Sequence, residues 1–167
     1  MDIALLIARL FFGLGLAAHG AQKLLGWFGG GGLNKTGEFF VQLGWNQGRF
    51  FATAASLGEV GGGLLLALGF LGPLGPAIMV VVLTTAALTV HVHNGFFVGK
   101  NGVELPLLYV MGALVLMFTG PGVWSLDYVF GLEWLSNDRY DWIALATALV
   151  IALANVALRR PPARAAT

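Results

Sequence analysis

Five long apolar stretches divide the chain into hydrophobic segments separated by short polar connections. Within each stretch the apolar residues follow one another without the strict alternation that a barrel strand requires. We read each stretch as an α-helix, because a membrane-spanning helix needs about 20 predominantly apolar residues. The predicted spans, of which the fourth is the shortest, are Ile3–Leu25, Phe50–Leu71, Pro73–His93, Val103–Thr119 and Trp142–Leu158.

Composition places these helices in a bilayer. The chain is 57% hydrophobic and 10% charged, with a mean hydropathy of +0.82, whereas soluble domains contain about 25% charged residues. We therefore predict an all-α integral membrane protein that folds as one bundle. In a four-span alternative the last stretch does not cross the membrane, but the uniformly apolar character of Trp142–Leu158 favours five spans.

The distribution of basic residues predicts the orientation of the bundle. With five spans, the first loop, the third loop and the C-terminus share one side, and the other side has Arg139 as its only basic residue. Cytoplasmic loops are rich in Lys and Arg, so we predict an outside N-terminus and a cytoplasmic C-terminus. The basic residues on the predicted cytoplasmic side are Lys23, Lys35, Arg49, Lys100, Arg159, Arg160 and Arg164.

Missing residue types narrow the chemistry. The chain has no cysteine, which excludes thiol relays and Cys-ligated iron–sulfur or zinc sites in this chain. Any redox role would therefore use a bound cofactor or a partner. A net charge of +1 without an arginine-rich run gives no indication of nucleic-acid binding. His91 and His93 point about 200° apart on a helix, so no metal site is predicted.

The first apolar stretch carries four polar residues, Arg9, His19, Gln22 and Lys23. A charged residue at the centre of a membrane helix costs about 2.5–3.5 kcal/mol, so such residues are expected to face the protein interior. Arg9 and His19 are ten residues apart, which is about 15 Å along the axis. Glu59, on the antiparallel second helix, is expected at a level between them. We predict that Arg9 pairs with Glu59, an arrangement that is more often structural than a proton relay.

A second polar group lies where the third helix ends and the fourth begins. Antiparallel folding brings it to the same end of the bundle as the shallow residues of the first helix. Such convergence suits a proton-handling site or a polar pocket, because each buried donor requires an acceptor. The alternatives are structural hydrogen bonds for the histidines and, for Lys23, a side chain that snorkels to the headgroups. The predicted cluster comprises His19, Gln22, Lys23, His91, Asn94 and Glu104.

Glycine and aromatic residues mark the helix surfaces and ends. Gly58 and Gly62 form a smooth surface of the GxxxG kind, for which packing inside the bundle is favoured over a homodimer face. The run Gly29–Gly32 is read as a flexible loop and not as a phosphate loop, because no GK[ST] ending follows. Aromatic residues near the predicted helix ends are typical of membrane-interface belts and are assigned no cofactor role. They are Trp27, Phe28, Trp45, Trp124, Trp134 and Trp142.

The order of these motifs resembles that of one known family. The opening RxxxGxxxxxHGxxKLxxWFGG of the DoxX family of small bacterial membrane proteins is similar to Arg9, Gly13, His19-Gly20, Lys23-Leu24 and Trp27-Phe28-Gly29-Gly30. The later resemblance lies in Gly58-Glu59 with Gly62-Gly63, in the HxxNGFF segment His91–Phe97, in Glu104 with Pro106, and in the closing GPGxxSLD of Gly120–Asp127. The resemblance covers roughly Ile3 to Asp127.

The resemblance implies a four-helix bundle in the bacterial plasma (inner) membrane, in a family whose members are often described as oxidoreductases. A related DoxD-type subunit is linked to thiosulfate:quinone oxidoreductase, and DoxX proteins are associated with membrane complexes that handle oxidative and thiol stress. This chain departs from the family in its fifth apolar stretch and basic tail. We therefore predict a DoxX-like four-helix core over residues 1–127, and a loop, a fifth transmembrane helix and a cytoplasmic tail over 128–167.

The leading hypothesis is a quinone-linked oxidoreductase or a subunit of a membrane redox complex. Histidine titrates near neutrality and a buried carboxylate can be tuned to match, as quinone protonation requires. The second hypothesis is a non-catalytic scaffold that recruits soluble partners, redox proteins among them, through Gly29–Gly32 and the tail. A small-solute transporter is the third, opposed by the absence of an inverted repeat. In the leading hypothesis the catalytic residues are His19, His91, Glu59 and Glu104, and the cofactor-binding residues are Gln22, Lys23, Asn94 and Arg9.

Overall fold

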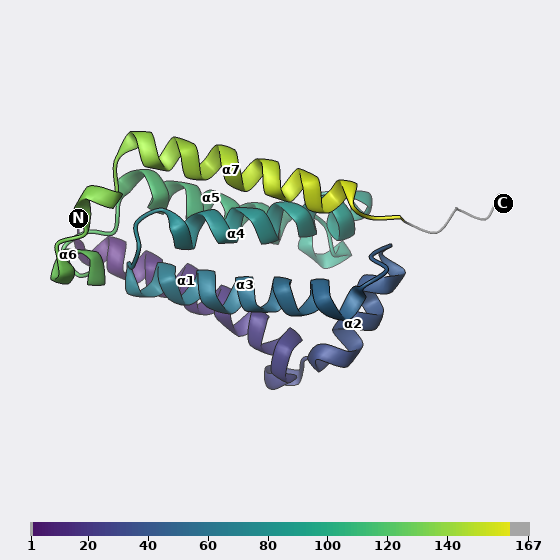
Figure 1. The fold of residues 1–167 in the computed structure, drawn as a ribbon. Helices are drawn as coiled ribbons and strands as arrows, with labels where there is room; N and C mark the ends of the chain where they lie inside the picture. Colours follow the sequence, from purple (N-terminus) through teal and green to yellow (C-terminus); the bar gives the residue numbers. More distant parts are fainter. Residues whose placement is uncertain (1, 161–167) are drawn as a thin grey trace.

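Capping residues set the ends of the long helices. The computed structural model describes residues 2–160, and every regular element in that range is helical (Figure 1). Helix α1 spans Asp2–Leu25, and α3 spans Gly48–Leu68. Helix α3 ends at Gly69, whose φ of +62° lies in the left-handed region that glycine adopts without strain. Helix α7, Asp138–Ala157, begins after Asn137, whose side chain accepts two backbone N–H bonds.

Five helices run along the bundle, namely α1, α3, α4 (Leu74–Ala86), α5 (Glu104–Thr119) and α7 (Figure 1). Four of the spans are long and apolar enough to cross a membrane, with α4 counted through Asn94. Helix α5 has 16 residues, which rise about 24 Å against a hydrocarbon core of roughly 30 Å. The prediction of an all-α multi-pass membrane bundle is confirmed, and the shortest predicted stretch is the shortest of these spans.

The two ends of the bundle carry different short elements. Helix α1 begins beside α6 (Leu126–Phe130), and α7 ends beside α2 (Gly32–Gln42), at the opposite end (Figure 1). We call these the α6 end and the α2 end. A chain that starts at one end and finishes at the other makes an odd number of passes, which agrees with five predicted spans. The side of the membrane that each end faces stays a prediction.

Helix α2 occupies a region for which no helix was predicted. Its first residue is Gly32, so only part of the expected flexible loop Gly29–Gly32 is a link between helices. Leu33, Thr36 and Phe40 are half-buried, and their spacing of three and four residues places them on one face. This weak amphipathic pattern is the signal that could have revealed the helix. The remaining short elements are η1 (Trp27–Gly29), η3 (Val92–Asn94), η4 (Val98–Lys100) and η5 (Glu133–Leu135).

Small residues bring α3 close to both of its neighbours. A Cβ added to Gly63 would lie 2.8 Å from the backbone nitrogen of Ala17 on α1. A Cβ added to Gly62 would lie 2.8 Å from Cγ2 of Ile78 on α4. The Gly58 and Gly62 surface therefore packs inside the chain, as favoured from sequence. Formation of homo-oligomers stays a prediction.

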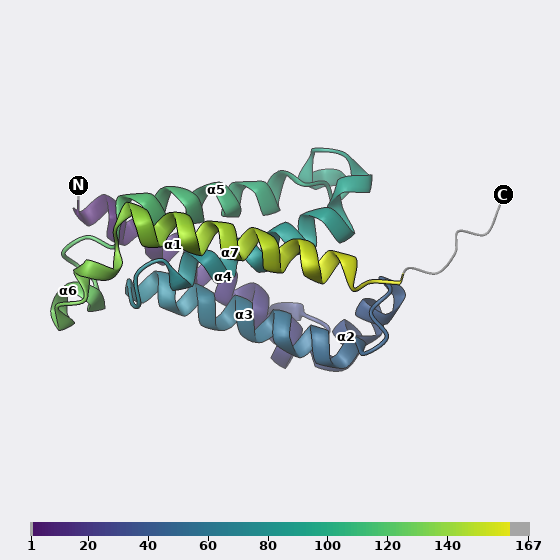
Figure 2. The same ribbon diagram turned by 45° about the horizontal axis from the view of Figure 1, so that its top comes forward.

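The core centres on α4, which packs against α3, α5 and α7. Figure 2 shows α7 lying over α4, between α5 and α3. Ala148 of α7 is buried in the main apolar cluster together with residues of the first four long helices. The division at residue 127 stays a prediction, and the tail from residue 161 onward, Arg164 included, lies outside the described residues. The buried cluster comprises Leu16, Leu66, Met79, Val80, Leu83, Tyr109, Ala113, Leu116 and Ala148.

Candidate functional site

A cavity of about 620 Å³ opens between α2, α3, α4 and α7 near the α2 end. Its volume falls in the range of small-molecule sites, about 300–1,000 Å³. The walls are mainly apolar and aromatic, with contributions from Phe40, Trp45 and Ile78. Two cationic side chains, Lys23 and Lys35, also line it. The other polar side chains of the lining are Thr36, Thr85, Thr89, His91 and Asn155.

The α4 wall of this cavity ends in a wide helical turn. The segment η2, Ala87–His91, has π-helical geometry, which occurs in short pieces and frequently at functional sites. Two of its carbonyl oxygens are bound by side chains. Nη1 of Arg159 donates to the oxygen of Thr89 at 3.3 Å, and Nδ2 of Asn94 donates to the oxygen of Val90 at 3.1 Å. The turn therefore places His91 at the cavity wall with its backbone satisfied.

Lys23 and Glu59 form a partly buried ion pair at the cavity wall. The ammonium of Lys23 donates to Oε1 of Glu59. The side chain of Lys23 is 34% exposed and that of Glu59 is 3% exposed. Oε2 of Glu59 has no hydrogen-bond partner in the described part of the chain. The pair thus presents an accessible cation, backed by an enclosed carboxylate with spare acceptor capacity.

The prediction that Arg9 pairs with Glu59 is wrong. Gly20 packs against Ser56 and Val60, so in the antiparallel arrangement Glu59 lies near the level of residue 19 of α1. Arg9 is ten residues away, about 15 Å along the axis. Side chains on a helix lean toward its N-terminus, and Lys23 therefore reaches back one turn to Glu59. Close packing at the glycines sets the register between α1 and α3. Counting residues from helix ends that hydropathy predicts does not determine this register.

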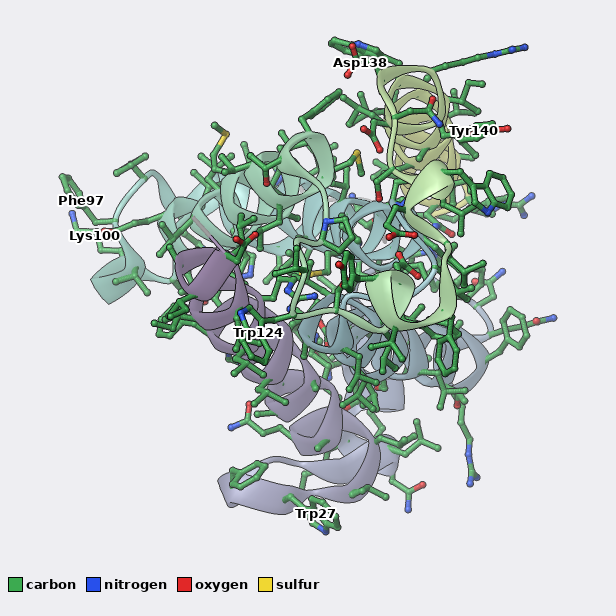
Figure 3. All side chains as sticks on the ribbon, turned by 90° about the vertical axis from the view of Figure 1, so that its left-hand side faces the viewer. Trp27, Phe97, Lys100, Trp124, Asp138 and Tyr140 are labelled. Carbon is green, nitrogen blue, oxygen red and sulfur yellow. The ribbon has the colours of Figure 1, made fainter. Side chains whose placement is uncertain are left out.

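Arg9 belongs to a separate site at the α6 end. It is 1% exposed, and its Nη2 donates to the backbone oxygen of Trp124. The negative charge of Asp127 attracts the guanidinium group of Arg9. Asp127 is fully buried, and its two oxygens accept the backbone N–H groups of Leu71 and Gly72 at 2.8 and 2.7 Å. Figure 3, viewed from this end, shows Trp124 beside the start of α1.

His19 lies outside the cavity lining, although it is on the same helix as Lys23. Its Nδ1 is 3.2 Å from Oε1 of Gln22. Its ring packs edge-on against the ring of Tyr109 of α5, with 6.1 Å between the ring centroids. Nε2 of Gln22 in turn donates to the backbone oxygen of Phe28 at 3.3 Å. This group joins the end of α1 to η1 and to α5, whereas Lys23, one turn further along α1, pairs with Glu59 of α3.

The third group shapes the loop between α4 and α5. Nδ1 of His91 and Nδ2 of Asn94 lie 2.8 and 3.2 Å from the backbone oxygen of Asn101. Glu104 accepts the backbone N–H of Val98 at 2.7 Å. Because Nδ1 of His91 faces a carbonyl oxygen, it carries the proton, and Nε2 is the nitrogen left for another partner.

The structure thus brings the predicted cluster to one end but divides it into three hydrogen-bonded groups. Lys23 with Glu59, and His91 with Asn94, belong to two groups that border the cavity, because Lys23 and His91 line it. His19 with Gln22 forms the third group, and neither residue lines the cavity. The catalytic and cofactor-binding assignments made from sequence stay predictions.

Two residues of the cavity end, the aromatic Trp45 and the basic Arg159, were not assigned to the site from the sequence. Trp45 was assigned to an interfacial belt, but it is 2% exposed and lines the cavity. The guanidinium of Arg159 lies 5.6 Å from the centre of its ring. The other residues of the predicted belt are exposed, as Figure 3 shows for Trp27 and Trp124. Trp45 differs because α2 folds over it, and α2 was not predicted.

Residues 2–160 contain no group of three or more His, Asp or Glu side chains arranged to hold a metal ion. The donors available to a ligand at the cavity are therefore organic ones. They are the ammonium of Lys23 and the imidazole of His91, because the hydroxyl groups of the lining threonines already donate to backbone oxygens. The arrangement suits a mainly apolar ligand with a few hydrogen-bond acceptors.

Comparison with known proteins connects this bundle to other sequences. An uncharacterized protein of Haemophilus influenzae is 35% identical over 63 residues, which cover 38% of this chain and 42% of that relative. The chain thus matches less than half the length of this relative. No solved structure matches the chain significantly. The DoxX family profile matches residues 4–92, just over half of the chain, and includes both Lys23 and His91. The chain therefore belongs to the DoxX family.

Proposed function

We propose that this DoxX-family protein binds the headgroup of a lipid-soluble quinone in the α2-end cavity, as a membrane subunit of a redox complex. The observation that carries the proposal is the mainly apolar cavity with Lys23 and His91 in its lining. A quinone headgroup has two carbonyl acceptors on an apolar ring. The ammonium of Lys23 supplies a donor for one such acceptor, and Nε2 of His91 supplies a second when the imidazole ring is doubly protonated. Trp45 supplies an aromatic wall.

Reduction of a quinone to a quinol consumes two electrons and two protons. In this proposal the electrons come from a partner redox protein, and this chain binds the headgroup and delivers protons. His91 is the proton donor in this proposal, because it lines the cavity and its hydrogen bond to Asn101 leaves Nε2 for the ligand. Glu59 holds Lys23 at the wall. His19 and Glu104 lie outside the lining, so they act as positioning residues for η1 and for the α4–α5 loop.

Binding can be tested with the purified protein in lipid nanodiscs and a short-tailed benzoquinone, measured by calorimetry. Ala55 lines the cavity, and we expect Ala55→Phe to abolish saturable binding by filling it. Leu57, on the same helix, is 54% exposed and does not line the cavity, so Leu57→Phe is the matched control. Lys23→Met should weaken binding at least about tenfold, since a hydrogen bond to a charged group contributes about 1.5–3 kcal/mol.

The redox role requires a separate test in cells. Membranes from a strain that lacks the protein are complemented with wild type, His91→Asn or His19→Ala, and quinol formation under oxidative stress is measured. We expect His91→Asn to reduce quinol formation more than His19→Ala does. The proposal fails if the purified protein does not bind a quinone analogue and neither substitution changes the cellular redox response.

The scaffold function is favoured by a different observation, the exposed aromatic residues at the α2 end. Trp27, Phe28 and Phe97 are 59%, 71% and 67% exposed, and Figure 3 shows Trp27 and Phe97 projecting on different sides of the molecule. Pull-down from membranes tests this function. Loss of a bound protein on deletion of residues 161–167, with unchanged recovery in Ala55→Phe, would favour a scaffold over the quinone site.

A further inference from the structure

A second apolar groove continues from the cavity toward the α6 end. It has a volume of about 550 Å³ and runs between α4 and α7, with the turn before α4 and the segment before α7 at its far end. Ile78, Val81 and Ile151 line both the cavity and the groove. Because the same side chains border both spaces, the cavity and the groove adjoin along α4, and we call the two together the trough. The part beyond the shared residues is lined by Leu74, Ala77, Trp134, Tyr140, Ala144 and Ala148, among others.

Polarity changes along this trough. The cavity has two lysines and a histidine in its lining, whereas none of the residues that line the groove is charged. On α4, the residues Leu74, Ala77, Val81 and Thr85 recur every three or four positions, so one helix face forms the floor throughout. A ligand with one polar end and one hydrocarbon end matches this gradient, with its polar end beside Lys23.

The α2 side of the cavity is closed by packed side chains. The guanidinium of Arg159 covers the ring of Trp45 and donates to the oxygen of Thr89. The next residue, Arg160, donates its backbone N–H to the oxygen of Gly44 at 2.8 Å. A tail that extends from a headgroup in the cavity away from these contacts lies along α4, beside the groove residues.

Resting on the proposed function, we infer that the ligand is a long-tailed lipid quinone whose tail lies in this groove. Pro73 and His91 are separated by 18 residue steps of α4 and its extension, or roughly 27 Å at the α-helical rise. This length is close to the roughly 30 Å of the hydrocarbon core. The trough thus accommodates a tail extended across most of the bilayer, with Trp134 and Tyr140 bordering its far part.

The groove acts on the placement of the tail more than on affinity. A tail that moves from lipid to an apolar groove gains little hydrophobic free energy, because lipid chains are as apolar as the groove. Affinity comes mainly from the headgroup. The inference is therefore tested by locating the tail, and comparison of binding constants between short and long quinones is not decisive.

The experiment uses two photoreactive quinones in nanodiscs that contain the full chain. One carries a diazirine at the tail end and the other carries it next to the headgroup, and cross-linked peptides are identified by mass spectrometry. We expect the tail probe to label residues 73–81 and 134–148, and the head probe to label the cavity. Excess untagged quinone should reduce both labels several-fold. A phosphatidylcholine with the same diazirine tail is the control for ordinary lipid contact, and its label should resist this competition.

Groove variants separate this inference from the proposed function. Ala144→Phe and Thr147→Phe fill the groove, and Thr147 is exposed, so its replacement perturbs the fold least. Both should lower tail labelling several-fold and leave head labelling unchanged. Ala146→Phe, exposed on another face of α7, is the matched control and should change neither. Competed head labelling with scattered, uncompeted tail labelling would overturn the inference alone. Absence of competed labelling by either probe would overturn the proposed function as well.

Discussion

The two ends of the bundle use the same helix, α1, in opposite ways. At the α6 end, Arg9 is 1% exposed and faces a void of about 10 Å³, which has room for about one water molecule. At the α2 end, Lys23 is one-third exposed and borders a cavity of about 620 Å³. Both cations are associated with a buried acid. A charged residue in a membrane helix therefore indicates a site, but access to that site decides whether a ligand can use it.

The difference follows from what each acid binds. Asp127 accepts two backbone N–H groups of the α3–α4 turn, including that of Leu71, whose φ of +64° is strained for a branched side chain. Its carboxylate is fully occupied by the fold. Glu59 has one oxygen on Lys23 and one without a partner. We expect the polar residues at the α6 end to stabilise the fold and those at the α2 end to bind a ligand.

Asp127→Asn should have the largest effect on stability. The amide replaces one carboxylate oxygen with a donor that faces a backbone N–H, and Arg9 loses its counter-charge in a buried site. Leaving a buried donor without its acceptor costs about 1–3 kcal/mol, and more for a charged group. The free energy of unfolding, measured by denaturant titration in mixed micelles, should fall by about that amount. Asp138→Asn, at an exposed position of the same end, should have little effect. Equal stability of the two variants would contradict a stabilising role for Asp127.

Gly63→Ala tests the seam between α1 and α3 that sets the level of both cations. The added Cβ would lie 2.8 Å from the backbone nitrogen of Ala17 and 3.2 Å from its Cβ. Overpacking of this kind costs about 1–3 kcal/mol. Gly61→Ala is the matched control, because nothing lies within 4 Å of its added Cβ, and alanine favours a helix. Thermal unfolding should show a lower midpoint for Gly63→Ala only. A loss of similar size in both variants would mean that α3 does not pack as described.

Hydropathy predicted the helices because a membrane span is defined by local composition. Five apolar stretches correspond to α1, α3, the extended α4, α5 and α7, and the glycine surface of α3 was assigned to internal packing. The partners of the charged residues could not be predicted in the same way. Whether Glu59 meets Arg9 or Lys23 depends on a helix register that side-chain packing sets. A stretch of apolar residues is compatible with several such registers.

Loop residues were still harder to interpret from sequence. Asp127 binds backbone groups 55 and 56 residues away, and such contacts leave no local pattern. Trp45 and Arg159 meet only because α2 folds over the cavity and α7 ends beside it. Of the candidate site, the sequence located the correct end of the bundle and two residues of the cavity wall, Lys23 and His91. It did not indicate the cavity itself, because a cavity is formed by helices that are distant in the chain.

Lys23→Met should destabilise the α2 end less than Asp127→Asn destabilises the α6 end. Glu59 loses its only partner, but Lys23 is one-third exposed, so water already screens part of the pair. We expect a loss of about 1–2 kcal/mol in the free energy of unfolding, between the values for buried and surface pairs. The double variant with Glu59→Gln should recover part of the loss, because no buried charge then remains unpaired. Lys35→Met, at an exposed cavity residue, is the control. A loss as large as that of Asp127→Asn would remove the contrast between the two ends.

Arg159→Gln should have the smallest effect on stability and a local effect on the cavity. The substitution removes a cation–π contact with Trp45, which contributes about 0.5–1 kcal/mol, and a 3.3 Å hydrogen bond to Thr89. Hydrogen exchange should therefore become faster in residues 43–46 and 87–91, while α1 and α3 remain protected. Arg160 contacts Gly44 through its backbone N–H and has an exposed side chain, so Arg160→Gln should leave exchange unchanged. Faster exchange confined to the α2 end would show that this end opens independently of the α6 end. Faster exchange over the whole bundle would instead mean that the two ends unfold together. The ends would then differ in their accessibility to ligands but not in their stability.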